Sequence, residues 1–99
     1  MFIETENASV EVRKKYRKTS KAQDMLGAGQ YGNVWLFEEK STNKEVAIKV
    51  MEKGIMTANE MATIKDEIGI LACFDHVNIV KHLESYEDAN YIYIVMEFI

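Results

Sequence analysis

The sequence has no proline, a single cysteine and no long apolar run. With Cys73 alone, no disulfide can form within the chain, and a reducing compartment is the expected setting. Every apolar run is shorter than the ~20 residues that span a bilayer. A secretory signal is not expected, because Glu4 and Glu6 stand where positive charge belongs, and Phe2 in place of glycine excludes N-myristoylation. These absences predict a cytoplasmic protein with no membrane anchor.

The composition is that of one small globular domain. The 99 residues are 47% apolar and 28% charged, which excludes a disordered or fibrous chain. Residues 1–21 carry a net charge of +3, from six basic and three acidic residues, whereas residues 22–99 carry −7. An acidic body binds nucleic acid poorly, so no nucleic-acid partner is expected. Residues 1–20 show no sustained period and predict a flexible basic leader, with the domain over residues 21–99.

The rest of the chain predicts three strands, a helix and two strands. Branched and aromatic residues favour the strands, and the helix begins at a capping-box spacing between Thr57 and Glu60. The apolar stripe of this helix recurs at steps of three and four, and the helix is expected to end near Phe74. The strands are expected at 22–26, 34–37, 46–51, 80–86 and 91–96, and the stripe consists of Met61, Ile64, Ile68 and Leu71.

A glycine-rich stretch, Leu26 to Val34, lies between the first two predicted strands. Its glycines, at 27, 29 and 32, have the Gly-x-Gly-x-x-Gly spacing that dinucleotide-binding folds also use, but there a helix follows and here a strand is expected. Two interpretations stay open. One is a chance glycine cluster in a hairpin, and the other is a hairpin folded over nucleotide phosphates, since glycine has no Cβ to hold a phosphate away.

Lys49 stands inside an otherwise apolar strand, where an unpaired ammonium would be costly. A period of two puts Ala47 and Lys49 on one face of that strand, and a small residue beside a lysine suits a flat ring and a phosphate. The alternative is a lysine on a half-exposed edge strand.

Glu67 flanks the apolar stripe of the predicted helix, from where it can reach a buried cation. Glu60 lies in nearly the same direction two turns earlier, so geometry alone does not separate the two, and an ordinary surface charge is the alternative. Neither histidine has a plausible set of metal partners nearby, so no metal site is expected.

Together these motifs resemble the N-terminal lobe of a eukaryotic protein kinase, over residues 22–99. The amino-acid sequence of the motifs is most similar to that of the calcium- and calmodulin-dependent serine/threonine kinases, with calcium-dependent protein kinases as the nearest subgroup. The resemblance implies an α+β fold, a five-stranded antiparallel sheet with one main helix, without the C-terminal lobe. The motifs are Leu26-Gly-Ala-Gly-Gln-Tyr-Gly-Asn-Val34, Val46-Ala-Ile-Lys49, Glu67 eighteen residues later, His76-Val-Asn-Ile79 and Tyr93-Ile-Val-Met-Glu97.

The resemblance also implies the site. Lys49 would bind the ATP phosphates and pair with Glu67, and these two are the implied catalytic residues. Met96 would be the gatekeeper behind adenine, an assignment that agrees with its plain packing in a strand core. The implied ATP-binding residues are Leu26, Gly27, Ala28, Gly29, Gln30, Tyr31, Gly32, Asn33, Val34, Ala47, Lys49, Met96, and Glu97 and Phe98 at the start of the hinge.

The function implied is transfer of the ATP γ-phosphate to hydroxyls of a protein substrate. Two residues depart from the family pattern: Val77 stands for the usual proline, and His82 for an apolar residue. The catalytic loop and the Asp-Phe-Gly that holds Mg²⁺ are not among the 99 residues, so these residues are expected to be an inactive fragment truncated at the hinge. The resemblance implies that calcium or calmodulin would regulate the kinase through segments outside these 99 residues. The alternative is a non-catalytic kinase lobe that binds a partner.

Overall fold

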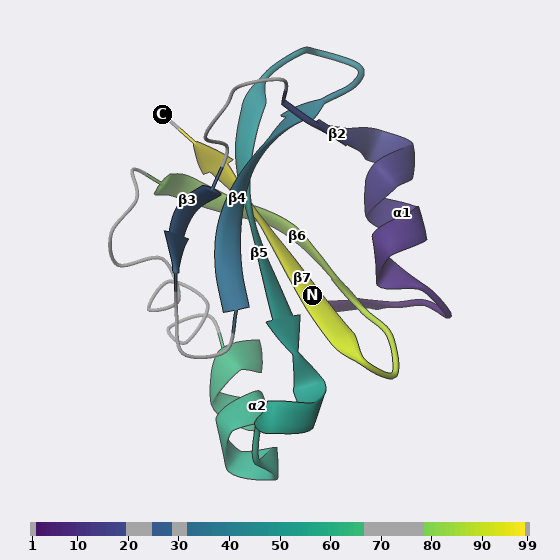
Figure 1. Ribbon diagram of the computed structural model, residues 1–99, viewed down its shortest axis with the longest axis vertical. Coiled ribbons are helices and arrows are strands. Elements are labelled where there is room, and N and C mark those ends of the chain that lie inside the picture. The colour runs from purple at the N-terminus through teal and green to yellow at the C-terminus, as the bar shows by residue number, and fades with distance from the viewer. Residues whose placement is uncertain (1, 20–24, 29–31, 67–78, 99) are drawn as a thin grey trace.

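The computed structural model describes residues 2–19, 25–28, 32–66 and 79–98. Within them a twisted sheet carries a helix on each side (Figure 1). The elements are β1 (Phe2–Glu4), α1 (Ala8–Lys15), β2 (Tyr16–Lys18), β3 (Met25–Ala28), β4 (Gly32–Glu39), β5 (Glu45–Glu52), the short 3₁₀ helix η1 (Lys53–Ile55), α2 (Ala58–Lys65), β6 (Ile79–Glu87) and β7 (Tyr91–Phe98).

The sheet has the order β1-β6-β7-β5-β4-β2, and β3 also pairs with β4. Four of the five strands expected from the sequence are present as β4 to β7. The first, expected at residues 22–26, overlaps β3 only at residues 25 and 26, and residues 22–24 lie outside the described residues. The pairings among β3 to β7 are all antiparallel. The prediction of a five-stranded, wholly antiparallel sheet is nevertheless wrong. The sheet has seven strands and is mixed, because β1 joins β6 in parallel and β2 joins β4.

Both additional strands come from the N-terminal segment, which differs from the flexible leader predicted over residues 1–20. Asn7 caps α1, since its side chain accepts a hydrogen bond from the backbone N–H of Val10 at 3.2 Å. Ala8, Val12 and Tyr16 follow at steps of four and are all buried. Three apolar residues among many charged ones make too short a stripe to be recognised as a helical period.

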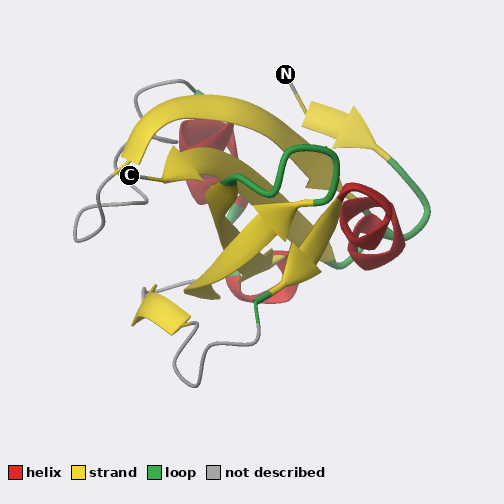
Figure 2. Cartoon of the chain, turned by 90° about the horizontal axis from the view of Figure 1, so that it is seen from above, coloured by secondary structure: helices red, strands yellow, loops and turns green. Residues whose placement is uncertain are grey.

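Alternation along the strands divides the core into two clusters, one on each face of the sheet. Figure 2 shows the twisted strands of this sheet from above. The α2-side cluster includes Ile64 of α2, and the α1-side cluster includes Ala8 and Val12 of α1. The α2-side cluster consists of Val34, Ala47, Met51, Ile64, Ile92, Ile94 and Met96, and the α1-side cluster of Ala8, Val12, Tyr16, Val46, Ile48, Tyr86 and Val95.

Two carboxylates on β6 attach the helices to the sheet. Glu84 accepts hydrogen bonds from the Tyr16 hydroxyl at 2.5 Å and from Lys15 Nζ at 3.2 Å. Glu87, only 8% exposed, lies 2.7 Å from Lys53 Nζ and 2.8 Å from Lys65 Nζ. Burial by itself would raise the pKa of each carboxyl, but the hydrogen bonds from these partners outweigh it and the pKa of both is lowered.

We expect the stability of the chain to fall in acid. Because the pKa of Glu84 and Glu87 is lower in the folded chain than in the unfolded one, their contribution is complete above the ordinary carboxyl pKa and is lost as the pH falls through the folded value. Urea unfolding between about pH 7 and about pH 3 measures this. The midpoint should drop in acid, and Glu84→Gln should flatten the profile. Equal midpoints across this range would contradict the assignment.

Candidate functional site

Lys49 lies in the interior of the sheet. Its strand, β5, pairs with β4 on one side and β7 on the other, so that Val34 and Ile94 stand opposite Lys49 in the two ladders. Lys49 is only 5% exposed. The interpretation of Lys49 as an edge-strand lysine is therefore wrong. Ala47 and Lys49 share a face with Met51, as the alternation predicted, and this face belongs to the α2-side cluster.

The residues expected around adenine also lie on this face. Ala47 stands opposite Met96 in the β5–β7 ladder, and both are 0% exposed. The partly buried side chains of Leu26 and Phe98 pack against the same cluster. Because Ala47 and Met96 have no exposed surface, an adenine ring reaches them only if neighbouring groups move.

The predicted start of the hinge falls inside β7. Glu97 stands opposite Val46 in the β5–β7 ladder, and Phe98 stands opposite Ile79 in the β6–β7 ladder. In this chain both residues are therefore the last residues of a strand.

The glycine-rich stretch is a hairpin of β3 and β4, with Gly27 opposite Val34 and Ala28 opposite Asn33. A strand follows Gly32, so the helix that a dinucleotide-binding turn requires is absent at this point of the described chain. Gly29, Gln30 and Tyr31 lie outside the described residues.

Gly27 and Gly32 differ in what surrounds them. A Cβ on Gly32 would lie 1.7 Å from the carbonyl oxygen of Val50, whereas a Cβ on Gly27 would meet no atom within 4 Å. Neither glycine has a positive φ. Packing against β5 therefore requires a glycine at Gly32. At Gly27, which is half-buried, the fold requires none, and there is open space beside its Cα for a ligand.

Helix α2 begins as the sequence predicted. Thr57 Oγ1 accepts from the backbone N–H of Glu60 at 3.1 Å, and Glu60 Oε1 accepts from the backbone N–H of Thr57 at 2.9 Å. Ile64 is buried and Met61 packs against the same cluster. The helix ends at Lys65, because Asp66 is already extended, with φ −76° and ψ 147°. The expectation of one unbroken helix from Thr57 to near Phe74 is therefore wrong. Glu67, Ile68 and Leu71, and the expected helix end at Phe74, lie outside the described residues.

His82 is partly buried on β6, and its Nε2 lies 2.7 Å from the Ser85 hydroxyl. Among the residues that the structure describes, no group of three or more histidine, cysteine, aspartate and glutamate side chains is placed to hold a metal ion. The helices within that part of the chain are also too short or too polar to cross a membrane.

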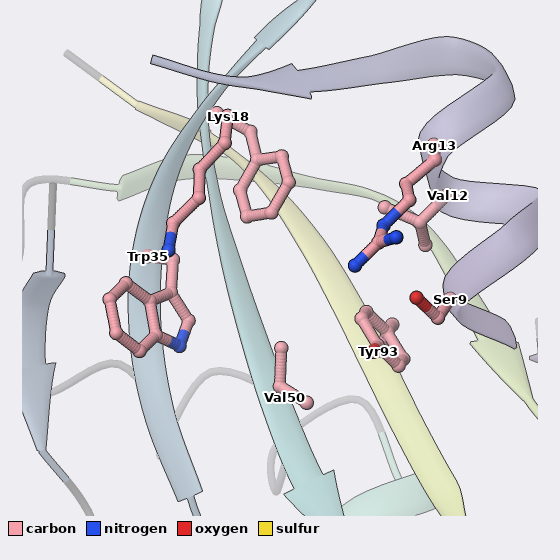
Figure 3. Close-up of a pocket in the computed structure, with 8 residues that line it drawn as sticks. Ser9, Val12, Arg13, Lys18, Trp35, Val50 and Tyr93 are labelled. Carbon is pink, nitrogen blue, oxygen red and sulfur yellow. The ribbon is translucent and has the colours of Figure 1, made fainter. Parts of the chain in front are cut away.

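Sequence reasoning missed a pocket on the opposite face of the sheet, beneath α1 (Figure 3). It is partly open to solvent and has a volume of about 130 Å³. Trp35 and Val50 alternate with Val34 and Lys49 along their strands and therefore face away from α2, but with residues 1–20 interpreted as a leader nothing was expected to cover this face. The lining residues are Ser9, Val12, Arg13, Lys18, Trp35, Phe37, Val50 and Tyr93.

The chain is similar to protein kinases in sequence and in structure. The family model described as "Protein kinase domain" matches residues 20–99. Calcium-dependent protein kinase 4 of Plasmodium berghei is 36% identical over 98 residues, which are 98% of this chain and 17% of that relative. Calcium/calmodulin-dependent protein kinase type 1 of Macrobrachium nipponense is 35% identical over 78 residues, which are 78% of this chain and 22% of that relative.

Among solved structures, "Titin kinase and its flanking domains" superposes with a TM-score of 0.65 at 26% identity, covering 100% of this chain and 17% of that one. The chain thus spans less than a quarter of the length of each of these three relatives. The resemblance stated from the motifs, including its calcium-dependent and calmodulin-dependent group, is confirmed.

Proposed function

The chain belongs to the protein kinase family, and from this premise we propose that it is the ATP-binding lobe of a protein serine/threonine kinase. The observation that carries the proposal is the position of Lys49, a lysine buried in the middle of a sheet on the same face as Ala47 and opposite Val34. The glycine hairpin of β3 and β4 adjoins Lys49, because Gly27 stands opposite Val34 and Val34 in turn stands opposite Lys49.

The proposal assigns each part of the nucleotide to residues of this face. We propose that Lys49 binds the α- and β-phosphates, that Val34 and Ala47 enclose the adenine, and that the Gly27 backbone approaches the phosphates, where no Cβ intervenes. Bound ATP would supply the phosphoryl group, and Lys49 would stabilise its charge. The pairing of Lys49 with Glu67 belongs to the same proposal.

The whole enzyme is proposed from the relatives. Mg²⁺, the catalytic base and the protein substrate would be bound by residues beyond these 99, so we expect the 99 residues alone not to transfer phosphate. Regulation by calcium or calmodulin, in keeping with the relatives' names, would also use other segments. A cytoplasmic location remains a proposal from the sequence.

A non-catalytic lobe that binds a partner is the second candidate function. The closed face over Ala47 and Met96, both without exposed surface, favours it, because an adenine-binding face needs to open. The two candidates differ in whether the chain binds nucleotide at all.

We expect the 99-residue chain to bind ATP with a dissociation constant no better than about 0.1–1 mM, because it supplies one wall of a cleft and must displace its own apolar cover. An NMR titration that follows the amides of residues 27–32 measures the affinity. Lys49→Met should weaken binding, and Lys81→Met, at an exposed position on β6, should not.

Absence of any shift at about 10 mM ATP would favour the non-catalytic lobe. Micromolar affinity would contradict the single-wall description and indicate that a second molecule completes the pocket.

A further inference from the structure

The pocket beneath α1 has an apolar and aromatic interior. Val12 belongs to the α1-side cluster, and Phe37, Val50 and Tyr93 pack against it. Figure 3 shows Trp35 and Tyr93 on opposite sides of the space, with Val50 between them. The pocket is partly open to solvent, and its volume of about 130 Å³ is close to the ~150 Å³ of a cavity known to take up benzene. The interior therefore has room for a single ring.

Two cations stand at the rim of this interior. The Arg13 guanidinium, from α1, points into the space from one side, and the Lys18 ammonium, from β2, approaches from the other (Figure 3). Lys18 Nζ lies 4.2 Å from the centre of the Trp35 ring. The Ser9 hydroxyl also lies on the lining, and none of the described residues that line the pocket carries a carboxylate.

Nearby carboxylates do not neutralise these cations. Glu11 pairs with Lys14 at 3.1 Å, and Glu38 pairs with Arg17 at 3.2 Å. Within the part of the chain that the structure describes, the Arg13 and Lys18 side chains take part in no ion pair. The pocket therefore presents two positive charges over an aromatic interior, and an anion bound there would meet no negative charge from the described residues of the lining.

We propose that this pocket binds a small aromatic acid, a single ring that carries one carboxylate. The ring would occupy the space bordered by Trp35, Val50 and Tyr93, and Arg13 and Lys18 would bind the carboxylate. This site is separate from the proposed nucleotide site, because Trp35 and Val50 alternate with Val34 and Lys49 and face the opposite side of the sheet.

Benzoate is the probe, and benzamide is its neutral counterpart of nearly equal size. The titration follows the indole N–H resonance of Trp35, the single tryptophan of the 99-residue chain, together with the amides of Val50 and Tyr93. We expect benzoate to shift these resonances and to bind about tenfold more tightly than benzamide, because only the acid forms charge-assisted hydrogen bonds.

Two variants test the role of the charge. Arg13→Gln should weaken benzoate binding about tenfold. Lys14→Gln removes the same charge from the next residue of α1, which does not line the pocket, and should change the affinity less than about twofold. The proposal is overturned if benzoate leaves the Trp35 resonance unmoved, if benzamide binds equally well, or if the two variants weaken binding equally.

Discussion

Lys49→Met in the full-length protein is expected to reduce phosphoryl transfer by about a hundredfold or more. Lys49 is buried on the face that carries Ala47 and Val34, and the proposed function gives its ammonium the task of stabilising phosphate charge. Methionine is similar in length and apolar, so it can occupy the same space between β4 and β7. The lower rate should therefore come from the missing positive charge beside the phosphates, while the fold is retained. A kinase assay with a protein substrate measures the rate.

Lys44→Met is the matched control. Lys44 lies exposed in the connection between β4 and β5, so the same chemical change there should leave the rate within about twofold of the unaltered protein. Urea unfolding of both variants shows whether the fold is retained. If the Lys49 variant is fully folded and keeps its activity, Lys49 does not bind the phosphates.

Gly32→Ala should destabilise the chain by about 3 kcal/mol or more. The added Cβ would lie 1.7 Å from the carbonyl oxygen of Val50, which is backbone and cannot move aside as a side chain would. The strands β4 and β5 must separate at this point, and their ladder loses hydrogen bonds. The free energy of unfolding, from urea titration, measures the loss.

Gly27→Ala is the control for this substitution, since the added methyl group would meet no atom within 4 Å. Its free energy of unfolding should stay within about 1 kcal/mol of the original chain, and alanine can even stabilise by restricting the unfolded state. Equal destabilisation by the two substitutions would mean that β4 and β5 are not paired as described at Gly32.

The central part of the fold was predictable because each signal was strong and local. The apolar strand around Lys49, the aromatic run before Met96 and the capping box at Thr57 each determine an element with few alternatives. Alternation then placed Ala47 and Lys49 on a common face, as the structure has them.

The N-terminal part was not predictable in the same way. The short stripe of α1 is stabilised by partners far along the chain, such as the Asp88 carboxylate, which accepts from the Ala8 N–H at 2.8 Å. The strand β1 pairs with β6, more than 80 residues away in sequence. Without these contacts the segment has no visible period, so its pairing and the pocket beneath it became apparent only from the structure.

The most direct test of the account is to identify which face of the sheet ATP contacts. Nuclear Overhauser effects between the adenine protons and the side-chain protons of the 99-residue chain provide this measurement. The account predicts contacts with Val34 and Ala47, on the α2 side. Contacts confined to Trp35 and Val50, in the pocket beneath α1, would contradict it, because ATP would then bind on the face opposite Lys49.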